Sequence, residues 1–106
     1  MKKEITKKLK EELKELKKLN DDMDLMNYIA ENSIYTEDIL DCNDDKVGIC
    51  FRIYMDYSND HSIWVNSEFM ELEYCKKGEI LDTLPLGREL GAKVKFYVKE
   101  MFLARV

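Results

Sequence analysis

The sequence predicts a single α+β domain over residues 1–106, with two amino-terminal helices, an antiparallel meander of three to four strands and a carboxy-terminal helix. Three observations lead to this fold class. Residues 46–57 alternate between apolar and other side chains, which is the period of a strand. Residues 3–19 carry apolar side chains at steps of three and four, the period of an amphipathic helix. Only four glycines and one proline interrupt the 106 residues, which favours long elements joined by short turns.

Two helices are expected before the sheet. The first covers residues 3–19, and its apolar positions are Ile5, Leu9, Leu13, Leu16 and Leu19. The segment Asn20-Asp21-Asp22 favours a stop and an N-cap over a helix interior, so a second helix is expected from Asp22 to Glu31. Its expected apolar side consists of Met23, Met26, Tyr28, Ile29 and Ala30. Thr36, followed by two acids, then indicates the start of a short helical turn that carries Ile39 and Leu40.

The main strand is expected from Lys46 to Tyr57, after a loop over residues 41–45. Its apolar residues occupy every odd position and should share one face of the sheet: Val47, Ile49, Phe51, Ile53, Met55 and Tyr57. Turn residues at 58–60 lead to a returning strand over residues 61–65, and the apolar parity then reverses in residues 68–75. A tight turn or bulge at Asn66-Ser67 accounts for this reversal. A hairpin turn at residues 76–78 leads to a fourth strand over residues 79–84.

A helix is expected to close the chain and to pack on the apolar face of the main strand. Pro85 suits its first position. One side of this helix would carry Leu86, Leu90, Val94, Tyr97, Met101 and Phe102. Two observations keep a terminal strand over residues 92–106 open as an alternative. Residues 94–99 also alternate, and Gly91 weakens a helix by ~1 kcal/mol relative to alanine.

The cysteines and the amino terminus bear on the compartment. Cys42, Cys50 and Cys75 are odd in number and form no C-x-x-C pair, so buried or half-buried thiols in a reducing cytosol are expected. A chain of this length can bury ~65% of its unfolded surface and needs neither disulfides nor metal to fold. The charged amino terminus has no apolar segment after it, and no apolar run approaches the ~18 residues of a membrane span. We therefore expect a soluble, cytoplasmic protein.

No catalytic arrangement is expected. The single histidine, His61, lies in a turn beside Asp60, where a solvated role is the ordinary one. An enzyme would need a pocket that gathers Asp56, Asp60 and His61. Because nothing in the sequence brings these residues together in a pocket, the chain is expected not to be an enzyme.

No metal or cofactor site is expected either. Residues 41–45 open like a D-x-N-x-D calcium loop, but Lys46 stands where glycine is needed and Arg52 where glutamate is needed. Residues 87–93 lack the spacing of a phosphate loop. Cysteine and histidine are too few, at usable spacing, for a zinc site.

The charge is distributed unevenly along the chain. Residues 1–18 carry eight lysines and four acids, residues 19–84 carry sixteen acids and four bases, and residues 85–106 carry five bases and two acids. The densest acidic segment, residues 21–45, contains nine acids and no base. Carboxylates fixed on folded elements can imitate nucleic-acid phosphates and steer association with a basic partner.

The preferred hypothesis is therefore a small acidic binding protein that occupies the basic groove of a nucleic-acid-binding protein or enzyme. It involves no membrane and no direct contact with nucleic acid. Phage antagonists of CRISPR or restriction systems and immunity proteins of nuclease toxins belong to this functional class. The predicted contacts are Asp21, Asp22, Asp24, Glu31, Glu37, Asp38, Asp41, Asp44 and Asp45.

The alternative hypothesis is a regulatory or structural module that forms a homodimer through its first helix, Ile5 to Leu19. The lysines beside that apolar stripe would be free to contact nucleic acid. The interleaved glutamates and a pI near 4.9 argue against nucleic-acid binding. Solvated surface remains the ordinary interpretation of both charged segments.

Overall fold

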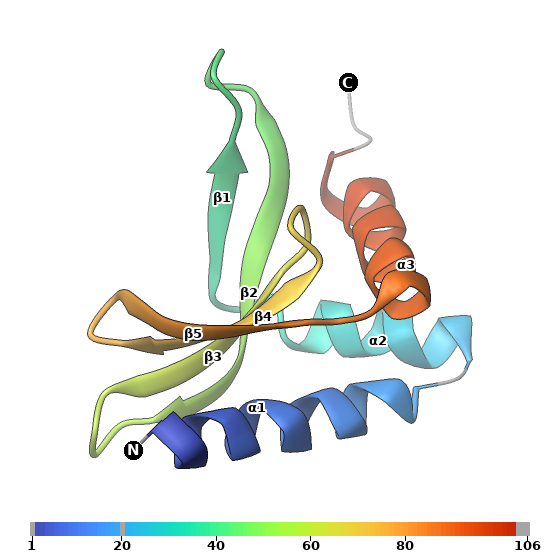
Figure 1. Cartoon of the computed structure of the whole chain (residues 1–106). Helices are drawn as coiled ribbons and strands as arrows, with labels where there is room; N and C mark the ends of the chain where they lie inside the picture. Colours follow the sequence, from blue (N-terminus) through green and yellow to red (C-terminus); the bar gives the residue numbers. More distant parts are fainter. Residues whose placement is uncertain (1, 20, 104–106) are drawn as a thin grey trace.

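The computed structural model describes residues 2–19 and 21–103, and its centre is an antiparallel sheet whose five strands lie side by side in chain order. The strands are β1 (Thr36–Leu40), β2 (Lys46–Asp56), β3 (His61–Asn66), β4 (Glu71–Lys76) and β5 (Glu79–Pro85). The helices are α1 (Lys2–Lys17), α2 (Asp22–Glu31) and α3 (Arg88–Val98), which continues as a π-helical turn, Lys99–Leu103. All three helices pack on the same side of the sheet (Figure 1). The predicted α+β class is confirmed, with five strands where three to four were expected.

Helix α1 lies along the end of the sheet formed by β4 and β5. Its Leu9 and Leu16 are only 1% and 2% exposed, as part of the hydrophobic core. Thr6 Oγ1 also donates a hydrogen bond to Asp82 Oδ2 on β5, at 3.2 Å. The apolar stripe predicted for this helix is thus confirmed. The chain's own core buries Leu9 and Leu16, two leucines of the stripe that the alternative hypothesis assigns to a dimer.

Helix α2 begins and ends where the sequence predicts. Asp21 caps its start, because the Asp21 side chain accepts the N–H of Met23 at 2.8 Å. The predicted apolar side is partly wrong. Met23 is 61% exposed, and the buried residues are Leu25 and Ile29. These two residues are four apart and therefore lie on one face of the helix.

The segment from Thr36 to Leu40 is strand β1, so the predicted short helical turn is wrong. Thr36 pairs with Phe51, and Ile39 pairs with Gly48. An isolated helical turn forms few hydrogen bonds, whereas this pairing satisfies backbone groups of both β1 and β2. The long-range pairing therefore outweighs the local capping signal of Thr36 and its two acids.

Strand β2 keeps the predicted alternation as far as Phe51, and a bulge then reverses it. The register between β2 and β3 slips between Arg52 and Tyr54, so Ile53 has no partner in β3. Tyr54 consequently packs against the core, while Met55 lines the opposite face. The prediction that all the odd residues share one face is therefore wrong beyond the bulge, because one extra residue moves every later side chain to the other side.

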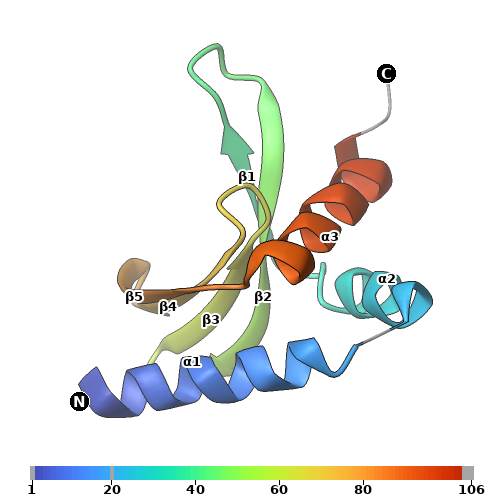
Figure 2. The ribbon, with the colours of Figure 1, turned by 45° about the vertical axis from the view of Figure 1, so that its right-hand side comes forward.

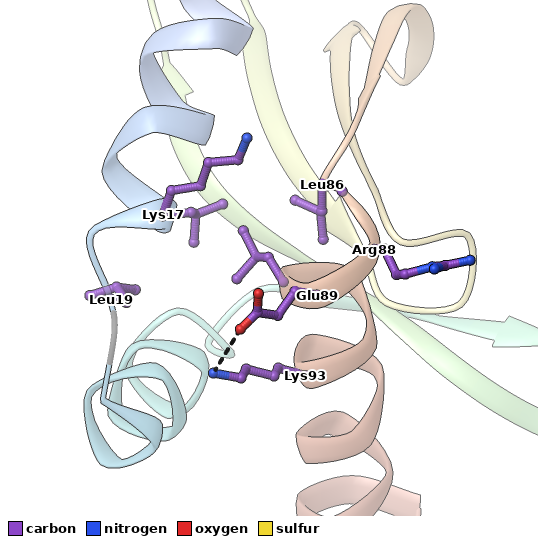
Figure 3. A pocket seen from close by; sticks show the side chains of 9 residues that line it. Lys17, Leu19, Leu86, Arg88, Glu89 and Lys93 are labelled. Carbon is purple, nitrogen blue, oxygen red and sulfur yellow. Dashed lines mark ion pairs between the residues drawn. The ribbon is translucent and has the colours of Figure 1, made fainter.

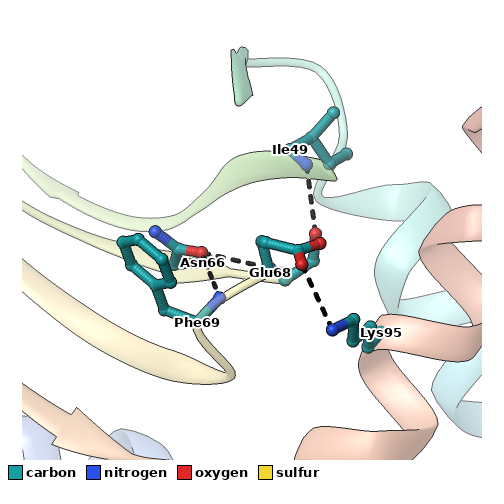
Figure 4. Close-up of polar contacts among 6 residues, drawn as sticks. Ile49, Asn66, Glu68, Phe69 and Lys95 are labelled. Atoms are coloured by element: carbon teal, nitrogen blue, oxygen red, sulfur yellow. Dashed lines mark hydrogen bonds and ion pairs between the residues drawn. The ribbon is translucent and has the colours of Figure 1, made fainter. Parts of the chain in front are cut away.

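The turn between β3 and β4 explains the predicted reversal of parity and ties the sheet to α3 (Figure 4). Asn66 Oδ1 accepts the backbone N–H groups of Glu68 and Phe69, at 3.1 and 2.8 Å. Ser67 Oγ accepts the N–H of Ile49 on β2 at 3.0 Å. Glu68 Oε1 forms an ion pair with Lys95 Nζ on α3 at 3.2 Å. The turn therefore holds β2, β3 and α3 in fixed relative positions.

A helix, not a strand, follows β5, as the preferred prediction states for this part of the chain. Its start is predicted wrongly, because Pro85 ends β5 and α3 begins at Arg88. Gly87 precedes the helix with a φ of 94°, a value that favours glycine. Val94 and Val98 are buried against the sheet. The last residues of the predicted closing element, 104–106, lie outside the described residues.

Candidate functional site

The structure divides the nine predicted contact residues between two places. The group on α2 and its cap comprises Asp21, Asp22, Asp24 and Glu31. The group on β1, the following turn and the start of β2 comprises Glu37, Asp38, Asp41, Asp44 and Asp45. Figures 1 and 2 show the tip of the β1–β2 hairpin well apart from α2. The nine acids that are consecutive charges in the sequence do not form one surface.

Two of the four acids at α2 already have structural roles. Asp21 is the N-cap described above. Asp22 Oδ1 lies 3.6 Å from Lys93 Nζ on α3, which is a weak ion pair between exposed groups. This half of the predicted site is therefore partly engaged in holding α2 to its own fold.

The second group forms a projection that we call the acidic hairpin, residues 37–46. Its turn is closed by Asp41, whose Oδ1 accepts the N–H groups of Asn43 and Asp45 at 2.8 and 3.0 Å. Asp44, with a φ of 63°, supplies the left-handed residue of the turn. These bonds fix the backbone at the tip and leave the side chains of Asp44 and Asp45 exposed.

The acidic hairpin has one basic residue against five acids. That base, Lys46, pairs with Asp38 across the two strands at 3.2 Å. Within residues 2–19 and 21–103, no ion pair reaches Glu37, Asp44 or Asp45. The tip extends away from α1 and α2 (Figure 2), so its carboxylates are accessible to a second molecule.

A feature that the sequence analysis missed lies on the face of the sheet opposite the core. Side chains of β1 to β5 enclose a hollow of about 250 Å³ there, which we call the open-face hollow. Two register shifts interrupt the strand pairing around it, one at Ile53 of β2 and one at Leu81 of β5, and such bulges increase the local bend and twist of strands. It is lined by Glu37, Cys50, Arg52, Met55, Asp60, Ser62, Trp64, Glu73, Cys75, Gly78 and Ile80.

Glu73 is the most unusual residue of this hollow, because it is a carboxylate with only 7% of its surface exposed. Asn66 Nδ2 donates to its Oε2 at 2.9 Å, and the Cys50 thiol makes a long contact of 3.8 Å with its Oε1. Among the described residues, no lysine, arginine or histidine forms an ion pair with it. Glu73 therefore lies almost buried with neutral partners only, which is rare for a glutamate.

The two thiols of the open-face hollow are chemically quiet. Burial, together with the charge of Glu73, raises the pKa of Cys50 to about 12 and that of Cys75 to about 11. Because the thiolate is the reactive form, neither is suited to nucleophilic catalysis near neutral pH. Both are free thiols, half-buried and buried respectively, as the sequence predicts, whereas Cys42 is exposed.

Arg52 forms the rim of the hollow, but its charge is directed toward two tyrosines. Its guanidinium carbon lies 3.9 Å from the centre of the Tyr35 ring and 5.8 Å from that of Tyr57. Its Nη2 also donates to the Tyr57 hydroxyl at 3.3 Å. Arg52 is thereby held in cation–π contacts and forms no ion pair with Glu73.

The three residues that an enzyme would need do not share a pocket. Asp56 accepts hydrogen bonds from Ser58 N and Asn59 Nδ2, and the bond from Asn59 is the main cause that lowers its pKa. His61 Nδ1 lies 2.9 Å from the hydroxyl of Tyr74. Asp60 lines the open-face hollow, but Asp56 and His61 do not. These contacts are those of a closed turn beside a strand.

A further cavity of about 470 Å³ lies between the end of α1 and the start of α3 (Figure 3). Leu16 and Leu86 are its buried apolar residues. Lys93 at its edge is already shared between Glu89, at 4.0 Å, and Asp22. The cavity thus lies where α1 and α3 meet, and the charge of Lys93 at its edge is already paired.

Within residues 2–19 and 21–103, no three His, Cys, Asp or Glu side chains are grouped so as to hold a metal ion. The same part of the chain contains no helix with the length and apolarity to span a bilayer.

Comparison with known protein families, with curated proteins and with solved structures finds no match. The acidic hairpin and the open-face hollow are the two features of the described residues from which a functional proposal can be argued. The first is half of the predicted site. The second carried no recognisable sequence signal, because Glu73 alternates with Leu72 and Tyr74 as a solvent-facing residue would.

Proposed function

We propose that the protein binds a basic, nucleic-acid-handling protein through the acidic hairpin and inhibits it by occupying the groove meant for nucleic acid. This proposal rests on one observation: five carboxylates and one lysine lie on a single projecting hairpin with a closed turn. A groove that binds nucleic acid is lined with lysine and arginine, so these carboxylates would replace phosphates there.

The geometry of the hairpin favours this role over a merely solvated surface. Its turn is fixed by the Asp41 bonds, so little backbone freedom is lost when a partner binds. Four of its five carboxylates form no ion pair within the described residues, so binding through them breaks no internal ion pair. Charges arranged in this way mainly accelerate encounter with an oppositely charged partner, and salt screens them.

The test compares two variants that remove equal charge. The hairpin variant is Asp38→Asn with Asp44→Asn and Asp45→Asn, and it keeps Asp41 so that the turn still closes. The α2 variant is Asp22→Asn with Asp24→Asn and Glu31→Gln. Each protein is immobilised and exposed to a bacterial lysate freed of nucleic acid, and bound proteins are eluted with salt and with added duplex DNA.

We expect the unmodified protein and the α2 variant to capture the same basic protein, which leaves the column with either salt or duplex DNA. The hairpin variant should lose that capture. Equal capture by both variants, or a bound protein that duplex DNA does not displace, would refute the proposal.

A second function is favoured by one specific observation on α1. Lys3, Lys7, Lys10 and Lys14 recur at steps of three and four and line one exposed side of the helix, with Glu11 as the acid among them. Such a stripe could contact a nucleic-acid backbone directly. Salt-dependent binding of labelled duplex DNA that Lys7→Gln with Lys10→Gln abolishes would favour this function.

A further inference from the structure

The open-face hollow contains an electrostatic imbalance that the fold itself does not resolve. Its lining includes three acids, Glu37, Asp60 and Glu73, and one base, Arg52. Arg52 is engaged with Tyr35 and Tyr57. Glu73 is therefore a nearly buried carboxylate whose hydrogen-bond donors are an amide and a thiol. A carboxylate accepts about four hydrogen bonds, so Glu73 retains acceptor capacity.

The position of Glu73 is fixed by its neighbours. The Oδ1 atom of Asn66 accepts two backbone N–H groups of the β3–β4 turn, which orients its Nδ2 toward Glu73. Trp64, which pairs with Glu73 across β3 and β4, donates its indole N–H to Ser62 Oγ at 2.8 Å. The carboxylate and the indole ring are thus held side by side before any ligand arrives.

We propose that the open-face hollow receives an arginine side chain of the basic partner, with Glu73 as its counter-ion and the Trp64 ring as its stacking surface. A hollow of about 250 Å³ is smaller than the ~300–1,000 Å³ of pockets that bind drug-sized molecules, so it suits a side chain. A guanidinium can donate to both oxygens of a carboxylate. It also binds favourably to the face of an indole.

This inference extends the proposed function from the acidic hairpin to the neighbouring face of the sheet. Glu37 connects the two, because it belongs to the hairpin and also lines the hollow opposite Cys50. The hairpin variant described above leaves Glu37 unchanged. The hairpin and the hollow can therefore be tested separately, and either proposal can fail alone.

The experiment uses N-acetyl-arginine amide as the probe and the full chain as it stands. Trp64 is the only tryptophan, so both the intrinsic fluorescence and the single indole N–H resonance report on this site. N-acetyl-citrulline amide is the neutral control of the same shape, and N-acetyl-lysine amide is the second cation. Glu73→Gln tests the counter-ion, and the exposed Glu89→Gln is the matched variant on α3.

We expect arginine amide to shift the Trp64 signals saturably in the millimolar range, with citrulline amide at least roughly tenfold weaker. The Glu73→Gln variant should lose the response by a similar factor, and Glu89→Gln should keep it. An equal response to citrulline amide, or one that survives Glu73→Gln, would overturn the site. Equal binding of lysine amide would overturn the assignment to arginine. The citrulline comparison needs no variant, so the test stands even if Glu73→Gln folds poorly.

Discussion

Replacing Glu73 by glutamine should make the free protein more stable, not less. A carboxylate that maintains the fold is expected to destabilise it when removed. A carboxylate kept for a partner's cation has an unmet desolvation cost in the free protein. Its removal relieves that cost. The substitution therefore separates a structural role from a binding role without any ligand.

The magnitude follows from the two contacts of Glu73. The desolvation of an ion costs several kcal/mol when it is buried without an opposite charge, and the hollow reduces this because it admits some solvent. Against this relief, the bond from Asn66 changes from charge-assisted to neutral, a loss of about 1 kcal/mol. The thiol contact of Cys50 at 3.8 Å is long and adds little. We expect a net gain of about 1–2 kcal/mol, or a rise in Tm of roughly 4–8 °C for each kcal/mol.

The assay is urea unfolding followed by circular dichroism at neutral pH, with Glu89→Gln measured in parallel. The exposed control should stay within about 0.5 kcal/mol of the parent. A loss of 1 kcal/mol or more in Glu73→Gln would show that the carboxylate is a structural element. That result would refute the reasoning that leads to a cation site.

Two further predictions concern packing and pH. Gly91→Ala should lower the free energy of unfolding by about 1 kcal/mol although alanine favours helices, because its Cβ would lie 2.9 Å from Met70 Cβ. In a chain that also carries Met70→Gly, Gly91→Ala should instead raise the free energy of unfolding. Urea unfolding measures both effects. If Gly91→Ala stabilises the chain that keeps Met70, the close approach is contradicted. The raised pKa values of Cys50 and Cys75 mean that the folded state holds protons which the unfolded state releases from about pH 9 upward. The contribution of these thiols to the free energy of unfolding is complete below pH 9 and falls as pH rises toward about 11 and 12. Urea unfolding at pH 8 and pH 10.5 should therefore show a smaller loss of stability between the two pH values in the double variant Cys50→Ala with Cys75→Ala than in the parent. An equal loss in both proteins would exclude these thiols as the cause.

The parts of the fold that the sequence predicts well are those with a long local signal. The period of three and four in residues 3–19 and the Asp21 cap are read directly, and the structure confirms them. The strand at Thr36 is missed because a five-residue segment has too short a pattern to compete with a capping signal. Its state is decided by the free edge of β2, which is distant in the sequence.

The candidate site shows a different limit. Counting charges locates the acids, but adjacency in the sequence does not place α2 and the hairpin on one surface. The open-face hollow depends on the bulge at Ile53, which moves Met55 to the side of Cys50 and Trp64. Glu73 reads as an ordinary solvent-facing residue of an alternating strand. Its neighbours come from β2, β3 and β5, so no local pattern reveals its burial.

The acidic hairpin and the open-face hollow should contribute to binding in different ways. Exposed carboxylates at a projecting tip act at long range, so their loss should mainly lower the association rate and reduce its dependence on salt. A nearly buried carboxylate acts only after contact, so the loss of Glu73 should mainly raise the dissociation rate. A partner that binds both the acidic hairpin and the open-face hollow must present an arginine beside its basic groove. A surface that was only solvated would give neither kinetic signature.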